Sequence, residues 1–187
     1  MDCYQNIIQS GAPTVMGIDP SLTSTGIAVI SGGSLYVQNI TTKAKGMGRL
    51  AFLRDTIMDR VEITKPDIIM LEGYSFASRG RGTFSLGELG GVLRLALYEA
   101  DQPVHVLSPN SLKLFVTGKG NANKTAVSLA LMKRWKVELD QEDQADATGL
   151  ALAAAYHLMP ALEPTVPEAQ LKALEKSEVL GAVESPK

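Results

Sequence analysis

The sequence predicts an α/β fold in which one mixed sheet of five strands is flanked by helices. Two observations support this fold class. The first forty residues alternate short apolar runs with turn signals, and the rest of the chain alternates apolar strands with segments of helical periodicity. With 187 residues, 45% of them hydrophobic, the chain is long enough for one substantial core. We expect one domain over residues 1–159, followed by a flexible or loosely docked tail over residues 160–187.

The first three strands are predicted between about residues 14 and 40. The apolar runs there are VMGID, GIAVI and LYVQNI, separated by the polar segments PSLTST and SGGS. The glycine pair of SGGS supplies the positive φ angles that a tight hairpin needs. The second and third strands should therefore pair as an antiparallel hairpin.

Helices and strands alternate after this hairpin. Residues 47–63 have apolar side chains at helical spacing, and Pro66 ends that helix before the strand-like run DIIML. The segment 84–100 has the pattern of an apolar helix and PVHVL that of a further strand. Ser108 and Pro109 are typical of the cap and first turn of a short helix. This order predicts helices on both sides of the sheet.

Two more helices complete the predicted domain. The side chain of Asn123 is suited to cap the start of the helix NKTAVSLALMKRW. The final helix should run from near Asp143 to about Met159, and its alanine-rich face can lie flat on the sheet. Beyond Pro160 the sequence contains prolines and a short Glu/Lys-rich pattern that offers little to a core.

Four carboxylates occupy the ends of predicted core elements. Asp19 and Glu72 each end an apolar run, while Asp143 and Asp146 are three residues apart at the head of the final helix and so share one face. Taken singly, these acids could be a turn residue, a strand-end carboxylate, a helix cap and a partner of the helix dipole. Taken together, they predict an oxygen-only site for hard divalent cations.

Composition excludes several other kinds of site. The single Cys3 has no partner for an internal disulfide, and His105 and His157 alone provide no zinc-binding spacing. No basic segment followed by an apolar stretch begins the chain, and no run is long enough to span a bilayer. We therefore expect a cytoplasmic protein in a reducing setting, without a membrane partner.

The net charge of −2 conceals a basic middle segment. Nine basic and three acidic residues lie between Arg79 and Lys136. A solvated helix face would account for any one of these cations, whereas their concentration in one part of the chain suits nucleic acid. Lys124 stands at a predicted helix start, where it opposes the helix dipole, and this favours a nearby phosphate.

The sequence resembles the RuvC-type Holliday-junction resolvases, which are metal-dependent endonucleases with the ribonuclease H-like fold. The resemblance runs from about Val15 to His157 and depends on GIDPSLTSTG, LEGYSF and DQADATGLALAAA. It implies that Asp19, Glu72, Asp143 and Asp146 hold two Mg²⁺ ions, for which Mn²⁺ can substitute. Lys113 and Lys124 fall on the family's two lysines, which would contact phosphate or stabilise charge in the transition state.

The resemblance also implies a substrate and an assembly. The substrate would be branched DNA, especially four-way junctions, nicked symmetrically by a homodimer to leave 5′-phosphate and 3′-hydroxyl ends. The helix LGELGGVLRLAL would help to form the dimer. Residues expected at the DNA are the loop aromatics that could wedge into a junction, the loop arginines and three lysines: Tyr74, Phe76, Arg79, Arg81, Lys113, Lys119 and Lys124. A compact resolvase with such loops would suit a phage genome and a phage-infected host.

Three alternatives remain open at the level of sequence. A broader debranching nuclease would use the same constellation of acids. A junction-binding module without catalysis would not need all four. An ATP-binding protein of the actin and sugar-kinase type would share the motif GIDPSLTSTG, but those proteins duplicate the fold and need a second glycine-rich phosphate motif, which is not evident here.

Overall fold

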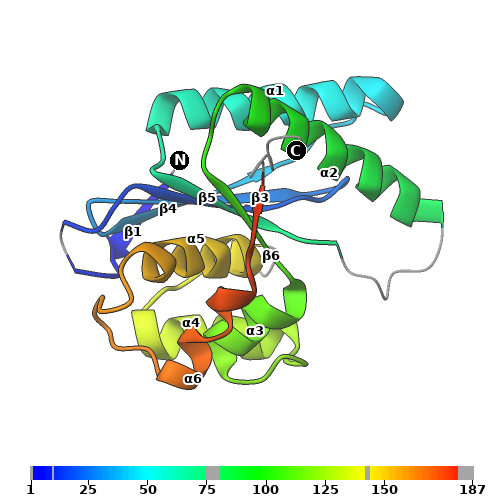
Figure 1. Cartoon of the computed structure of the whole chain (residues 1–187). Coiled ribbons are helices and arrows are strands. Elements are labelled where there is room, and N and C mark those ends of the chain that lie inside the picture. The colour runs from blue at the N-terminus through cyan, green and yellow to red at the C-terminus, as the bar shows by residue number, and fades with distance from the viewer. Residues whose placement is uncertain (1, 10, 75–80, 142–143, 181–187) are drawn as a thin grey trace, which may run out of the picture.

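The computed structural model describes residues 2–9, 11–74, 81–141 and 144–180. Within these residues it has a seven-stranded mixed sheet in the order β1-β4-β3-β2-β5-β6-β7, with helices on both faces (Figure 1). The strands are β1 (Asp2–Asn6), β2 (Val15–Asp19), β3 (Thr25–Ser31), β4 (Ser34–Ile40), β5 (Ile68–Glu72), β6 (Val104–Leu107) and β7 (Glu178–Leu180). The helices are α1 (Gly46–Thr64), α2 (Arg81–Glu99), α3 (Pro109–Thr117), α4 (Lys124–Trp135), α5 (Gln144–Leu158) and α6 (Glu168–Leu171), with a 3₁₀ turn at Leu174–Lys176.

The predicted hairpin lies between β3 and β4. Gly32 and Gly33 have φ angles of 59° and 87°, as a tight hairpin between right-twisted strands requires. β2, β3 and β4 pair antiparallel, whereas β2, β5 and β6 pair in parallel. The ends of β2 and β5 therefore lie at the same edge of the sheet.

Successive side chains of each strand point to opposite faces of the sheet, so the core has two layers. Met16, Ile18 and Leu71 belong to the cluster under α1 and α2, while Val15 and Met70 belong to the cluster under α5, α3 and α4. Figure 1 shows α1 and α2 on one face of the sheet and α5 on the other. Every second side chain of a strand faces the same side of the sheet. Asp19, four residues after Val15, and Glu72, two residues after Met70, must therefore face α5. None of the helices in the described ranges is long and apolar enough to cross a membrane.

Helix α5 approaches β2 more closely than a side chain would permit. A Cβ atom added to Gly17 would overlap the carbonyl oxygen of Ala147 and the amide nitrogen of Ala151, and would lie 2.9 Å from the carbonyl carbon of Leu150. All residues of α5 from Gln144 to Tyr156 are buried. The alanine-rich face predicted from the sequence thus lies directly against the sheet, with glycine as the strand residue at the contact.

The sheet has two strands more than the five predicted, and both lie at its edges. β1 pairs with β4 and β7 pairs with β6, each antiparallel and each along one side only. β7 lies in the segment predicted as a tail. Within residues 160–180, which are the part of that segment the structure describes, Leu162, Val166 and Leu174 are buried in the core beneath α5.

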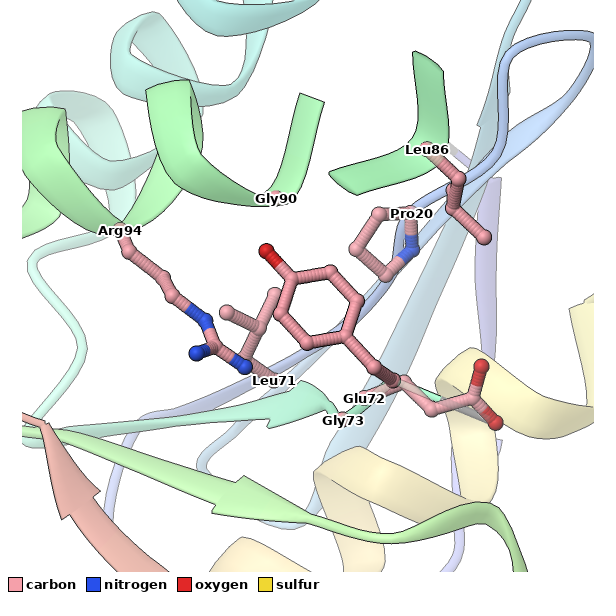
Figure 2. Close-up of a pocket in the computed structure, with 8 residues that line it drawn as sticks. Pro20, Leu71, Glu72, Gly73, Leu86, Gly90 and Arg94 are labelled. Carbon is pink, nitrogen blue, oxygen red and sulfur yellow. The ribbon is translucent and has the colours of Figure 1, made fainter. Parts of the chain in front are cut away.

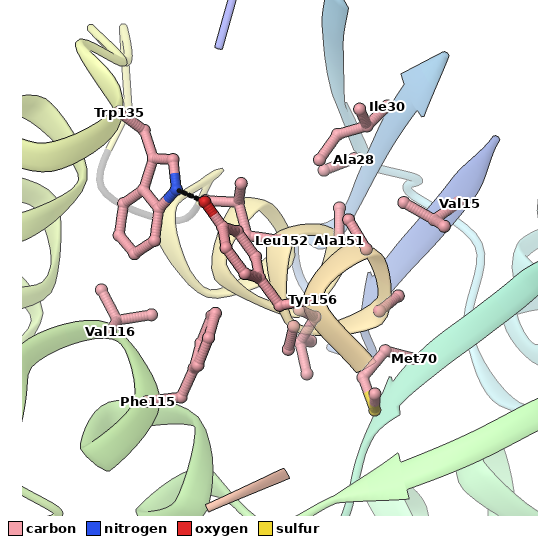
Figure 3. Close-up of a cluster of buried hydrophobic side chains, with 14 of the residues drawn as sticks. Val15, Ala28, Ile30, Met70, Phe115, Val116, Trp135, Ala151, Leu152 and Tyr156 are labelled. Carbon is pink, nitrogen blue, oxygen red and sulfur yellow. Dashed lines mark hydrogen bonds between the residues drawn. The ribbon is translucent and has the colours of Figure 1, made fainter. Parts of the chain in front are cut away.

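An aromatic cluster fixes the start of this C-terminal segment. The indole Nε1 of Trp135 donates a hydrogen bond of 3.0 Å to the hydroxyl of Tyr156 (Figure 3). That hydroxyl donates one of 2.6 Å to the carbonyl oxygen of Pro164. Phe115 packs against both rings, with centroid distances of 6.0 Å and 5.8 Å. One hydroxyl therefore joins α4, α5 and the segment that leads to β7.

Replacing Tyr156 by Phe should destabilise the protein by about 1–3 kcal/mol. The change keeps the ring but leaves the buried indole N–H and the Pro164 carbonyl without the hydroxyl that joins them. Urea denaturation monitored by the fluorescence of Trp135, which is the single tryptophan of the chain, measures the effect. An unchanged urea midpoint would mean that water replaces the hydroxyl without lowering the free energy of unfolding.

Candidate active site at the ends of two parallel strands

Asp19 and Glu72 lie side by side at the carboxyl ends of β2 and β5. The parallel register pairs Ile18 with Leu71, so the next residue of each strand falls at the same level. Both side chains project from the face that α5 covers, because they follow Gly17 and Met70 by two residues. Hydrophobic strands thus deliver two carboxylates to one point, as the sequence predicts.

Asp146 reaches the same point from the first turn of α5. It is 8% exposed, and its charge acts on Glu72. The close approach of α5 to Gly17 sets this position, since the first turn of the helix then lies beside the end of β2. Lys113 of α3 also acts on Glu72, with a charge of the opposite sign. The structure therefore brings together three of the four predicted acids and one predicted lysine.

The crowding of acids changes the protonation of Glu72. Burial raises the pKa of its carboxyl to about 9, and the negative charge of Asp19, a hydrogen bond to the Asp19 carboxylate and the charge of Asp146 act in the same direction. The ammonium group of Lys113 opposes this rise of the pKa. Without a cation, burial and the neighbouring carboxylates therefore favour the protonated form of the Glu72 carboxyl.

The donor set fits a hard divalent cation. All the donor atoms are carboxylate oxygens, which Mg²⁺ and Mn²⁺ prefer, and a cation would replace the proton that now separates Glu72 from Asp19. Among the described residues no group of three or more His, Cys, Asp or Glu side chains forms a ready-made metal site. Asp143, the fourth predicted ligand, lies outside the described residues.

The other predicted residues lie on neighbouring segments of the chain or outside the residues that the structure describes. Lys124 is exposed at the first position of α4, and Lys119 is exposed just beyond α3. Tyr74 packs toward α2, where its hydroxyl donates to the carbonyl oxygen of Gly87 at 3.2 Å. Phe76 and Arg79 lie outside the described residues, and Arg81 begins α2 with a side chain that is also outside them.

Two residues of α2 were not predicted from the sequence as functional residues. Arg94 lines a small cavity together with Glu72 and Tyr74, and its guanidinium carbon lies 4.5 Å from the centroid of the Tyr74 ring. Phe84, in the first turns of α2, is 80% exposed. Neither residue is distinguished by the sequence as functional. Arg94 is a single charged residue within the apolar helical pattern of residues 84–100, and Phe84 fits that pattern.

The raised pKa of Glu72 predicts a pH-dependent stability. Between about pH 5 and pH 9 the folded protein keeps a proton that the unfolded chain, with a carboxyl pKa of 4.5, has released. The metal-free protein should therefore lose stability as pH rises through this window. His105 and His157, whose pKa values are lowered by burial, act with the opposite sign but only near and below pH 7.

We expect the melting temperature in EDTA to fall by about 3 °C or more from pH 7 to pH 8.5. Glu72→Gln, which carries no titrating proton, should remove most of this slope. Calorimetry of both proteins across the pH range checks the prediction, and equal slopes would contradict it.

Comparison with known proteins places the chain in a family. The family model of the crossover junction endodeoxyribonuclease RuvC matches residues 15–156. The RuvC of Mycobacterium sp. (strain KMS) is 32% identical over 174 residues, which cover 84% of this chain and 94% of that relative. The RuvC of Dictyoglomus turgidum is 26% identical over 151 residues, which cover 76% of this chain and 96% of that relative.

Solved structures agree with this placement. Thermus thermophilus RuvC in complex with Holliday junction substrate superposes with a TM-score of 0.68 at 23% identity, covering 83% of this chain and 99% of that one. The yeast mitochondrial Holliday junction resolvase Ydc2 has a TM-score of 0.55 at 15% identity, covering 89% and 82%. These likenesses confirm the predicted ribonuclease H-like fold. By its match over most of its length, the chain belongs to the RuvC family of crossover junction endodeoxyribonucleases.

Proposed function

We propose that this protein resolves four-way DNA junctions by paired symmetric nicks, using divalent cations held by Asp19, Glu72, Asp143 and Asp146. The observation that supports the proposal is the proximity of Asp19, Glu72 and Asp146 at the strand ends, where the charges of Asp19 and Asp146 both act on Glu72. Carboxylates whose negative charges raise the pKa of a neighbour have an electrostatic reason to bind a cation. Family membership supplies the reaction.

The acids and Lys113 would have separate roles in cleavage. Asp19, Glu72, Asp143 and Asp146 would together hold the cations through their carboxylate oxygens. When bound, Mg²⁺ would activate a water molecule and stabilise the leaving oxygen of the scissile phosphodiester. Lys113, already close enough to influence Glu72, would lie against the phosphate and offset its growing negative charge. The products would have 5′-phosphate and 3′-hydroxyl ends.

Lysine side chains would hold the DNA backbone. Lys119 and Lys124 are exposed, and α3 brings Lys113 to the carboxylates from the same region of the fold. Contacts of this kind release counterions, so affinity for junctions should fall steeply with salt. The aromatic that enters the junction would be Phe76 or Phe84, since the side chain of Tyr74 packs toward α2.

A homodimer would present two such sites to the two opposed strands of a junction. Exposed apolar side chains support self-association: Leu95 and Tyr98 on α2, and Met47 on the neighbouring helix α1, all face solvent in the single chain. Burying such residues against a second copy would give the two-fold symmetry that paired nicks require.

The proposal is tested by cleavage of labelled four-way, forked, flapped and linear duplex DNA in Mg²⁺ and in Mn²⁺, with cut positions mapped on every strand. We expect paired nicks at matched positions of the four-way junction and none in the linear duplex. Equal cutting of forks and flaps would indicate a broader debranching nuclease. A junction that is bound but left intact in both metals would overturn the proposal.

A further inference from the structure

Tyr74 is seated in the surface of α2. Its hydroxyl donates to the carbonyl oxygen of Gly87, and the guanidinium group of Arg94 lies over its ring at 4.5 Å from the centroid. The Nε atom of Arg94 is buried and makes no hydrogen bond to the described residues, so the ring is its principal neighbour there. Although 37% exposed, the Tyr74 side chain is thus held from two turns of the same helix.

A single glycine provides the room for this ring. A Cβ atom on Gly90 would lie 2.5 Å from the Tyr74 hydroxyl oxygen and 2.8 Å from its Cε1 atom, which are closer than side-chain atoms approach. A Cβ atom on Gly91, the next residue of the helix, would meet nothing within 4 Å. Of the two adjacent glycines, Gly90 lies against the Tyr74 ring and Gly91 does not.

The seated ring lies two residues beyond Glu72. Between them, the amide of Gly73 donates a hydrogen bond of 2.8 Å to the carbonyl oxygen of Leu107 at the end of β6. Figure 2 shows Gly90 and Arg94 on α2 and the carboxylate of Glu72 pointing away from them. The backbone that leaves β5 is therefore fixed on one side by β6 and on the other by α2.

We propose that Tyr74 is a positioning residue for cleavage: seated at Gly90 and beneath Arg94, it fixes the end of β5 so that Glu72 faces Asp19 and Asp146. The proposal rests on the proposed nuclease function. It gives Tyr74 a role other than contact with DNA bases. A displacement of about 1 Å at a reacting group is enough to lower a rate by roughly 10²-fold, so loss of this seat should slow cleavage rather than weaken binding.

The test compares Gly90→Ala with the matched control Gly91→Ala. Both add one methyl group to the same helix and gain the same helix propensity. Gly90→Ala should lower the single-turnover cleavage rate at saturating junction and Mg²⁺ by about 10-fold or more, with the junction Kd unchanged within about 3-fold. Gly91→Ala should cut at the wild-type rate. Sedimentation and melting of both variants verify that association and folding are equal.

Two further variants separate seating from general stability. Tyr74→Ala should slow cleavage as Gly90→Ala does, whereas Tyr74→Phe, which keeps the ring under Arg94, should restore most of the rate. Because Gly90→Ala acts by displacing the ring, it should have no effect in the Tyr74→Ala background. Additive effects in this cycle, or equal rates for Gly90→Ala and Gly91→Ala, would overturn the proposal.

Hydrogen exchange gives a readout that does not depend on activity. The amides of residues 68–73 should exchange faster in Gly90→Ala than in Gly91→Ala, in metal-free protein without DNA. Identical exchange would overturn the seating proposal even in an active enzyme. A wild-type protein that fails to cut junctions would instead overturn the nuclease proposal, while the exchange result would still decide whether Tyr74 fixes the end of β5.

Discussion

Replacing Asp19 by Asn should lower junction cleavage by roughly 10³-fold while leaving the protein folded and able to bind DNA. The negative charge of Asp19 contributes to the raised pKa of Glu72. An amide of the same shape removes that charge and half of the oxygen donors. The residues that would hold the cations would then bind them more weakly, although the fold has no reason to change.

Single-turnover cleavage of a labelled four-way junction in Mg²⁺ measures this effect, and gel-shift binding in Ca²⁺ measures affinity separately. Asp55→Asn is the matched control, because Asp55 is exposed on α1 and forms an ion pair with the adjacent Arg54. The control should cut as the wild type does. An Asp19→Asn variant that cuts within about 10-fold of the wild type would exclude Asp19 from the metal site.

Replacing Gly17 by Ala should destabilise the protein by about 3 kcal/mol or more. The added methyl group would overlap backbone atoms of Ala147 and Ala151, and backbone in the middle of a buried helix has no rotamer to change. Relief requires α5 to move away from β2. Such a shift would also carry Asp146 away from Asp19, so any folded fraction should cut slowly.

Urea denaturation followed by tryptophan fluorescence, together with cleavage at low temperature, tests both parts of this expectation. Gly48→Ala on α1 is the control, because a Cβ atom there meets nothing within 4 Å, and the helix should gain up to about 1 kcal/mol. Equal midpoints for Gly17→Ala and the wild type would show that α5 adapts.

Much of this fold could be predicted from local sequence signals. Short apolar runs bounded by turn signals located the five central strands, and the glycines of SGGS located the hairpin between β3 and β4. Ser108 and Asn123 cap α3 and α4 through their side chains, accepting hydrogen bonds from Ser111 and Ala126. These signals are local, since each depends on residues within one turn or one strand, and a single sequence contains them in full.

The features that escaped prediction depend on contacts between distant segments. β1 and β7 are short edge strands, and neither DCYQN nor EVL shows a clear alternation of apolar and polar residues. The burial of Leu162, Val166 and Leu174 depends on the underside of α5. Nothing near Gly17 or Gly90 indicates that one contacts a helix backbone and the other a tyrosine ring.

For the candidate site, residue types could be predicted but their mutual arrangement could not. The placement of Asp19, Glu72 and Asp146 at the ends of core elements was enough to predict a common cluster. The hydrogen bond between Asp19 and Glu72, and the influence of Lys113 rather than a more distant cation, follow from side-chain positions that only the folded chain defines.

The order of these acids along the chain has a consequence for biosynthesis. Asp19 and Glu72 leave the ribosome early, but Asp146 is carried by a helix that follows all the central strands. Because that helix must lie on β2 to bring its acid into place, a nascent chain lacking it has two carboxylates and no completed cluster. Catalytic competence would therefore arrive late in translation, together with the closing of the core, and partly synthesised chains would not cleave junctions.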